Sequence, residues 1–236
     1  RVLAGFSRVI PEGGLDQAQK KALLRRNEPA EGKNWLPACK VYGEGIFITL
    51  CEDMLRQWEA FESVKNRAEI LNLQYVRVCA ERGFTPKAIT ARFILIHTLA
   101  HLLINRLTFE CGYSSASLRE RLYVSDNADA PMAGFLIYTS SGDAEGTLGG
   151  LVRMGKADNF EPIFRRALEN ATWCSADPVC SETGNYGGQG PDSCNLAACH
   201  NCCLVPETSC EEFNRFLDRC LVVRTVACNV ESFFVF

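Results

Sequence analysis

The feature that most constrains this chain is a cluster of cysteines: seven of its thirteen cysteines fall between positions 174 and 210. Four of them are spaced as Cys194-x4-Cys199-x2-Cys202-x7-Cys210. A Cys-x2-Cys pair lets two thiolates from one loop reach the same ion, and Zn²⁺ takes four such ligands in a tetrahedron. The spacing therefore predicts a zinc site around Cys199 and Cys202. The other two ligands stay open among Cys174, Cys180, Cys194, Cys203 and Cys210.

The predicted ligand set also indicates what the metal does. A zinc ion held by four thiolates has no coordination position left for water or substrate, whereas catalytic zinc sites keep one position open and favour histidine and carboxylate ligands. We therefore expect a structural Zn²⁺. It would contribute folding free energy on the order of 10 kcal/mol to a loop that cannot bury a core of its own.

The composition favours a folded protein without general affinity for nucleic acids or membranes. With 236 residues, 47% of them hydrophobic, the chain can bury one good core or two modest ones. Its net charge of -3 gives no global attraction for DNA or RNA. The longest apolar run, residues 93–104, is interrupted by His97 and His101 and is too short to span a bilayer. No membrane role is expected.

The positions of the cysteines indicate where in the cell the protein is expected, and the first residue indicates whether the chain is a segment of a longer protein. Secreted disulfide scaffolds are short and spread their cysteines along the chain, whereas nine of the thirteen cysteines here lie at or beyond Cys174. We therefore expect the protein in the reducing cytoplasm. The chain begins at Arg1, directly on an apolar stretch, and we expect it to be a segment of a longer protein.

Hydrophobic periodicity predicts an α+β fold that is mostly helical, with a small sheet and a cysteine-rich loop near the C-terminus. The strongest signal is a helix from Pro86 to about Glu110, with Thr85 as its N-cap and Gly112 as its stop. Shorter helices are predicted over 52–73, 114–122, 160–172 and 211–223. Strands are predicted over 41–50, 135–139 and in the tail 224–236, and residues 1–36 are predicted to be a connector.

Two histidines stand one helical turn apart in His97-Thr-Leu-Ala-His101, the spacing of zinc peptidases. The general base is missing, because Thr98 stands where that mechanism needs glutamate. We interpret both histidines as buried and hydrogen-bonded to neighbouring backbone, with contact to the region after residue 139 as an alternative. Zinc ligation by them is not expected, since enough thiolates are present. A rival hypothesis is a nuclease or other hydrolase using His97, His101, Asp143 and Glu145.

Several long strings resemble a known family. They are His97-Thr-Leu-Ala-His101-Leu-Leu-Ile, Glu110-Cys-Gly-Tyr-Ser-Ser-Ala-Ser-Leu-Arg-Glu-Arg-Leu-Tyr123, Trp173-Cys-Ser-Ala-Asp-Pro-Val-Cys180 and Ala198-Cys-His-Asn-Cys-Cys-Leu-Val-Pro-Glu-Thr-Ser-Cys-Glu211. Together they resemble the C-terminal zinc-binding domain of DrmB, a component of the DISARM anti-phage defence system. The same module, the MrfA-associated zinc-binding domain (MZB), is fused to superfamily 2 DNA helicases. The resemblance implies a domain over 86–236, preceded over 1–85 by a connector and a strand and helix region.

The resemblance also implies a ligand set. In the fused helicases the ligands look like a compact four-cysteine set that Cys194, Cys199, Cys202 and Cys210 nearly reproduce. In DrmB-like sequences the cysteine after Asp-Pro, here Cys180, is the more regular first ligand. The implied ligands are therefore Cys180, Cys199, Cys202 and Cys210, with Cys194 as the first replacement and Cys174 also open.

The function that the resemblance implies is that of a non-enzymatic subunit with no catalytic residues. Such a subunit would partner a DrmA-like superfamily 2 helicase in a DISARM-type heterocomplex and help it engage foreign DNA. Contact with DNA would be made through the complex.

Overall fold

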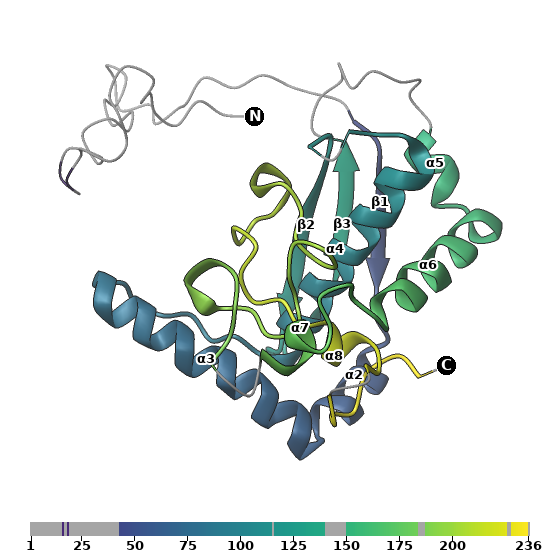
Figure 1. Ribbon diagram of the computed structural model, residues 1–236. Coiled ribbons are helices and arrows are strands. Elements are labelled where there is room, and N and C mark those ends of the chain that lie inside the picture. Colours follow the sequence, from purple (N-terminus) through teal and green to yellow (C-terminus); the bar gives the residue numbers. More distant parts are fainter. Residues whose placement is uncertain are drawn as a thin grey trace. The chain divides into compact units, whose positions relative to one another are not determined.

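The structure, a computed structural model, describes Asp16, Ala18 and residues 43–114, 116–139, 150–183, 187–225 and 228–235 (Figure 1). The residues from Gly43 onwards form one compact unit, and Arg1–Tyr42 are grouped separately. Nearly all of the predicted connector over 1–36 lies outside the described residues, as do Asp143 and Glu145. The domain boundary predicted after residue 85 stays a prediction. It falls inside the compact unit, between two helices.

The elements confirm a mainly helical α+β fold with a small sheet. In chain order they are β1 (Gly45–Thr49), α2 (Glu52–Glu59), α3 (Glu62–Arg82), α4 (Ala91–Cys111), β2 (Leu118–Ser125), β3 (Met132–Thr139), α5 (Gly150–Met154), α6 (Ala157–Ala171), α7 (Val179–Glu182) and α8 (Arg219–Val222), with 3-10 turns η3 (Pro191–Ser193) and η4 (Glu207–Ser209). Among the described residues, none of these helices combines the length and the apolar character that a membrane crossing requires.

Helix α4 is the centre of the core, and fourteen of its residues are buried. In Figure 1 it lies against the sheet, with α6 beside it. Its start differs from the prediction: the hydroxyl of Thr90, not Thr85, accepts a hydrogen bond from the Phe93 amide at 3.3 Å. The segment over 84–90 is neither helix nor strand, and the Ile89 amide in it donates to the Asn72 side chain of α3 at 3.3 Å. The helix ends, as predicted, at Gly112, whose φ of 68° suits a residue without a side chain.

The sheet is antiparallel in the order β1-β3-β2. The strands predicted over 41–50 and 135–139 are confirmed as β1 and β3, but the helix predicted over 114–122 is wrong, because residues from Leu118 onwards pair with β3. Leu118 and Glu120 alternate with more exposed neighbours, so both point to the buried face. Leucine, arginine and glutamate favour helices, yet pairing with β3 outweighs that local preference.

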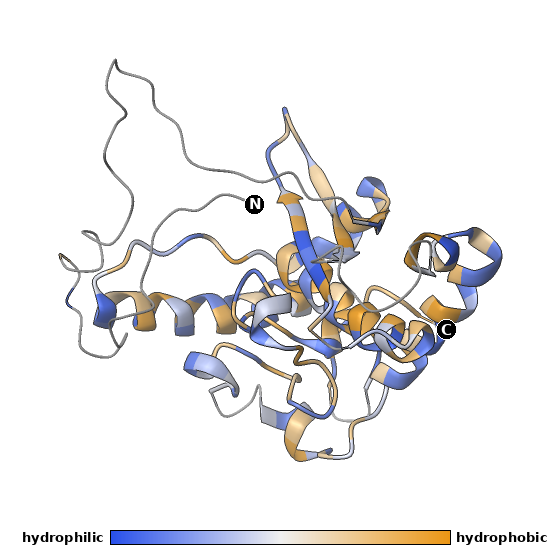
Figure 2. Cartoon of the chain, turned by 90° about the horizontal axis from the view of Figure 1, so that it is seen from above, coloured by the Kyte–Doolittle hydropathy of each residue, from blue (hydrophilic) through white to orange (hydrophobic). Residues whose placement is uncertain are grey.

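The single helix predicted over 52–73 is two helices, α2 and α3. The chain turns at Phe61, whose ψ of 133° is extended. The turn lets α2 reach the C-terminal tail, where the Trp58 indole donates to the Glu231 carbonyl oxygen at 2.6 Å. Figure 2 shows hydrophobic and hydrophilic residues alternating along α3, the long helix, and its buried residues include Val64 and Leu71.

The C-terminal segment contains less helix than predicted. The helix predicted over 160–172 is confirmed as α6, but of the one predicted over 211–223 only α8 is helical. Phe213, Asn214 and Phe216 have positive φ angles of 54°, 59° and 64°, which interrupt any helix. The Asn214 side chain bonds the Val205 amide at 3.0 Å and its carbonyl at 2.7 Å, which fixes this loop. The tail forms a parallel bridge between Val223 and Phe234, and a disulfide joins Cys220 and Cys228.

A buried arginine provides a stability test of this arrangement. The Arg92 side chain is 3% exposed and donates to Glu59 at 2.7 Å, to Glu52 at 3.2 Å and to the Ser125 carbonyl at 2.9 Å. We expect Arg92→Met to lower the free energy of unfolding by about 2 kcal/mol, because the half-buried Glu59 carboxylate loses its partner and Glu52 is left with Arg56 alone. Urea denaturation measures this.

The matched control is Arg165→Met, which removes an exposed ion pair with Glu161 on α6. That change should stay within about 0.5 kcal/mol of the unsubstituted protein. Equal unfolding midpoints for the two variants would contradict the role assigned to Arg92.

Candidate metal centre

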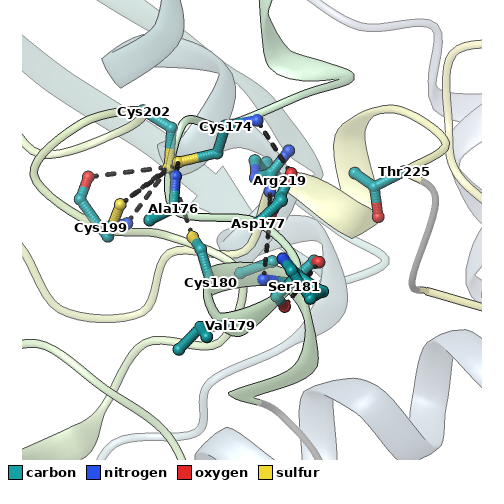
Figure 3. Close-up of polar contacts among 12 residues, drawn as sticks. Cys174, Ala176, Asp177, Val179, Cys180, Ser181, Cys199, Cys202, Arg219 and Thr225 are labelled. Atoms are coloured by element: carbon teal, nitrogen blue, oxygen red, sulfur yellow. Dashed lines mark hydrogen bonds and ion pairs between the residues drawn. The ribbon is translucent and has the colours of Figure 1, made fainter.

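Four cysteine sulfur atoms converge where the loop after α6 meets the loop after η3. Cys174 and Cys180 come from the first loop and from α7, and Cys199 and Cys202 come from the second. Their Sγ atoms lie within 4.8 Å of one another. Figure 3 shows Cys174, Cys199 and Cys202 close together, with the Cys180 sulfur turned toward them. Cys174 and Cys180 are buried, whereas Cys199 and Cys202 are half-buried.

The distances between these sulfurs fit one Zn²⁺ ion. The Sγ separations are 3.5 Å for Cys174 and Cys199, 3.8 Å for Cys180 and Cys202, and 3.7 Å for Cys199 and Cys202. A tetrahedron with Zn–S bonds of about 2.3 Å has edges of about 3.8 Å. Four thiolates at such separations suit zinc and leave no ligand position open.

Local backbone hydrogen bonds shape both loops. The amides of Cys203 and Leu204 donate to the Cys199 carbonyl at 3.0 and 3.2 Å, which closes a tight turn around the Cys-x2-Cys pair. The Ala176 amide donates to the Cys174 sulfur at 3.4 Å. Amides that donate to sulfur favour the thiolate, which is the form that binds metal.

Asp177 fixes the first loop. Its carboxylate accepts from the Cys174 amide at 2.9 Å and from the Ser181 amide at 3.2 Å. The buried Arg219 guanidinium bonds the same carboxylate and the Ala171 carbonyl, the latter at 3.0 Å. Burial acts to raise the pKa of Asp177, but the hydrogen bonds from Arg219, Cys174 and Ser181 and the charge of Arg219 together outweigh it, and the pKa is lowered. Asp177 thus stays ionised and holds Cys174 and Cys180 in place.

Cys174 and Cys180 of this cluster resist ionisation in the absence of a cation, because the pKa of each thiol is raised. Burial raises the pKa of Cys174 to about 11. The pKa of Cys180 is raised well above its usual range, first by its hydrogen bond with Cys202 and then by burial. A divalent cation reverses this preference, because its charge stabilises neighbouring thiolates. The donor set therefore fits a bound metal ion.

The structure brings together three of the four cysteines that the resemblance implied: Cys180, Cys199 and Cys202. Cys174, which the spacing had left open, lies beside them. Cys210 lies elsewhere, with its sulfur 3.2 Å from Nε2 of His97, because the Glu211 amide after it bonds Glu120 of β2 at 3.1 Å. The short spacing from Cys174 to Cys180 was the signal that could have favoured Cys174.

Cys194, named as the first replacement, lies outside the four-cysteine cluster. It is fully buried, with its sulfur 3.5 Å from the Asp192 carbonyl oxygen.

His97 and His101 are fully buried on α4. Nδ1 of His101 lies 3.0 Å from the Cys203 carbonyl oxygen, as the interpretation of buried histidines bonded to backbone predicted, although this carbonyl is far away in sequence. His97 and His101 face Glu120, at 3.1 and 3.5 Å from its Oε1 atom. Glu120 was missed because its segment was predicted to be helical. Asp143 and Glu145 lie outside the described residues.

A change at Asp177 tests the support of the cysteine cluster. We expect Asp177→Asn to weaken zinc binding by about 10- to 100-fold, because Arg219 loses its charged partner and the loop loses its anchor. Competition with a chromophoric chelator measures this. Asp129→Asn, in an exposed turn, is the matched control. Equal zinc affinities for the two variants would contradict the anchoring role.

The fourth ligand is tested by paired cysteine substitutions in the cobalt-loaded protein. We expect Cys174→Ser to lower the thiolate-to-cobalt absorption as strongly as Cys202→Ser does, because each removes one metal–sulfur bond. Cys194→Ser, also buried, should leave the spectrum unchanged. The opposite pattern, with Cys194→Ser altering the spectrum and Cys174→Ser not, would show that Cys194 is the ligand.

Comparison with known proteins places this geometry in a family context. Residues 99–203 match the MrfA Zn-binding domain (MZB), a range that contains all four clustered cysteines and ends before Cys210. The chain is 40% identical over 238 aligned residues to the "DISARM protein DrmB" of Bacillus paralicheniformis (strain ATCC 9945a / NCIMB 11709 / CD-2). This alignment covers 99% of the chain and 40% of that relative. The resemblance stated from the sequence is confirmed.

Proposed function

Because residues 99–203 match the MrfA Zn-binding domain in a chain that aligns with DrmB, we propose that the chain is part of a non-enzymatic subunit of a DISARM-type antiviral defence complex. It partners a DrmA-like superfamily 2 helicase in the cytoplasm and helps the complex engage foreign DNA. The observation that carries this proposal is the four-cysteine cluster inside the matched range. The chain spans 40% of the length of that relative. The partners of the whole protein are therefore proposed and not observed.

The zinc ion is proposed to be structural. Cys174, Cys180, Cys199 and Cys202 supply all four positions of a tetrahedral site, which leaves none for a substrate. When bound, Zn²⁺ would cross-link the loop after α6 to the loop after η3. Between residues 174 and 218 the described chain has only short helical turns. Such a segment depends on cross-links, because it buries little regular structure of its own.

The alternative of a hydrolase that uses His97, His101, Asp143 and Glu145 has less support. Both histidines are fully buried, so a DNA strand cannot reach either ring without unfolding the core. Glu120 and Cys210 already occupy the space around them. The overall charge of -3 also gives the chain no electrostatic pull on DNA, which favours engagement of DNA through a partner.

Co-purification tests the proposed function. The full-length protein is expressed with and without a DrmA-like helicase. We expect it to retain the helicase through size-exclusion chromatography and to cleave no DNA by itself. Cys202→Ser should lose the helicase, because the zinc-dependent segment loosens, whereas Cys194→Ser should retain it.

Two results would overturn the proposal. One is DNA cleavage by the protein alone that His97→Ala abolishes while the fold is retained. The other is complete absence of a helicase from complexes of the unsubstituted protein. Tight, salt-sensitive DNA binding without any partner would instead indicate an independent DNA-binding module.

A further inference from the structure

A second group of side chains of metal-ligand type is separate from the four-cysteine cluster. It consists of His97 and His101 of α4, Glu120 of β2, and Cys210, which follows η4. The side chains of His97, His101 and Glu120 are 0% exposed, and Cys210 is 9% exposed. We propose that these four residues form a second metal site, which binds one Zn²⁺ ion. This proposal replaces the expectation that the histidines bind no metal.

The distances within this group fit a single ion. Nε2 of His97 lies 3.2 Å from the Cys210 sulfur and 3.1 Å from Oε1 of Glu120. Nε2 of His101 lies 3.5 Å from the same oxygen. All four ligand atoms lie within 4.8 Å of one another. With metal–nitrogen bonds of about 2.0 Å and one metal–sulfur bond of about 2.3 Å, a tetrahedral site has edges of about 3.3 to 3.5 Å.

The His101 ring is oriented as metal-binding histidines usually are, whereas Nδ1 of His97 has no hydrogen-bond partner within the described ranges of the chain. Nδ1 of His101 donates to the Cys203 carbonyl oxygen at 3.0 Å, which leaves the lone pair of Nε2 directed into the group. A hydrogen bond from the other ring nitrogen to a backbone carbonyl is how proteins fix the tautomer of a metal-binding histidine. Nε2 of His101 has no hydrogen-bond partner among the described residues. A metal ion would satisfy it.

Backbone amides position Glu120 and Cys210. Oε1 of Glu120 accepts from the Glu211 amide at 3.1 Å, whereas Oε2 is buried and has no hydrogen-bond partner in the described part of the chain. The Cys210 sulfur accepts from the amides of Glu212 and Asn214 at 3.3 and 3.2 Å. The contact from two residues downstream repeats the contact between the Ala176 amide and the Cys174 sulfur in the first cluster.

Charge balance is consistent with a bound zinc ion. A carboxylate and a thiolate with two neutral imidazoles carry two negative charges, which one Zn²⁺ ion neutralises inside the core. Two added protons would also balance the charge, so the metal count of the purified protein separates the two cases. The mixture of nitrogen, sulfur and oxygen donors suits Zn²⁺ rather than Mg²⁺ or Ca²⁺.

A metal ion at this site would link segments that are far apart in the sequence. The four ligands come from α4, β2 and the loop after η4, so one ion would hold the sheet and the C-terminal loop against the central helix. The two sites also adjoin, since Cys202 belongs to the first and the carbonyl of Cys203 orients His101 of the second. The site is closed and buried, which makes it structural rather than catalytic.

The experiment counts and identifies the sites in the whole protein, purified under reducing conditions without chelators. We expect two zinc ions per chain by elemental analysis. After exchange for cadmium, the ¹¹³Cd NMR spectrum should contain two resonances, one from an all-sulfur site and one from a site with a single sulfur. One zinc ion per chain with only the all-sulfur resonance would overturn the proposal.

Variants then assign the second resonance. Cys210→Ser and, independently, Glu120→Gln should remove the single-sulfur resonance and one zinc ion, whereas Cys194→Ser should retain both. Retention of both resonances in the first two variants would overturn the proposal. Loss of the all-sulfur resonance alone counts against the first site and leaves the second standing. The measurement on the unsubstituted protein decides the matter even where a variant fails to fold.

Discussion

The burial of α4 along nearly its whole length is the constraint on which the other elements depend. A helix surrounded by protein must have each of its polar side chains satisfied from within the fold. Thr98 bonds its own helix at 2.7 Å and accepts from the Asp218 amide at 2.9 Å. Arg92 takes its partners from α2 and from the Ser125 carbonyl of β2, and His101 takes one from Cys203. The polar residues of α4 therefore position segments that lie far away in sequence.

The cysteine-rich part of the chain is stabilised differently. It has little regular structure, so side chains satisfy its backbone groups in place of helix and sheet ladders. Asn195 accepts from the Leu217 amide at 3.0 Å and donates to the Asn214 carbonyl at 2.7 Å. Asp218 pairs with Arg67 of α3 at 2.6 Å and accepts from the Ala197 amide at 3.3 Å. Metal ions at one or both clusters would cross-link this network and fasten it to α4.

Where local pattern and local chemistry agree, the sequence predicted the fold correctly. The apolar spacing of α6, the β-branched residues of β1 and β3, and the stop at Gly112 each act within a few residues. The prediction failed at Leu118–Ser125, where helix-favouring residues pair with β3. It also failed at Phe61, where contact with the tail turns the chain. Both errors arise because long-range partners outweigh local preference.

At the metal centre, too, local spacing predicted one part of the site and long-range packing decided the rest. Spacing alone predicted that Cys199 and Cys202 share an ion, because two residues between cysteines permit little else. Spacing could not choose between Cys174 and Cys210, because that choice depends on where distant loops return. The pairing of β2 with β3 turns Glu120 toward α4, and Glu120 holds the backbone beside Cys210 next to the histidines. Residue types thus determined which chemistry is possible, and the packing of β2 and the loops on α4 determined which residues share a site.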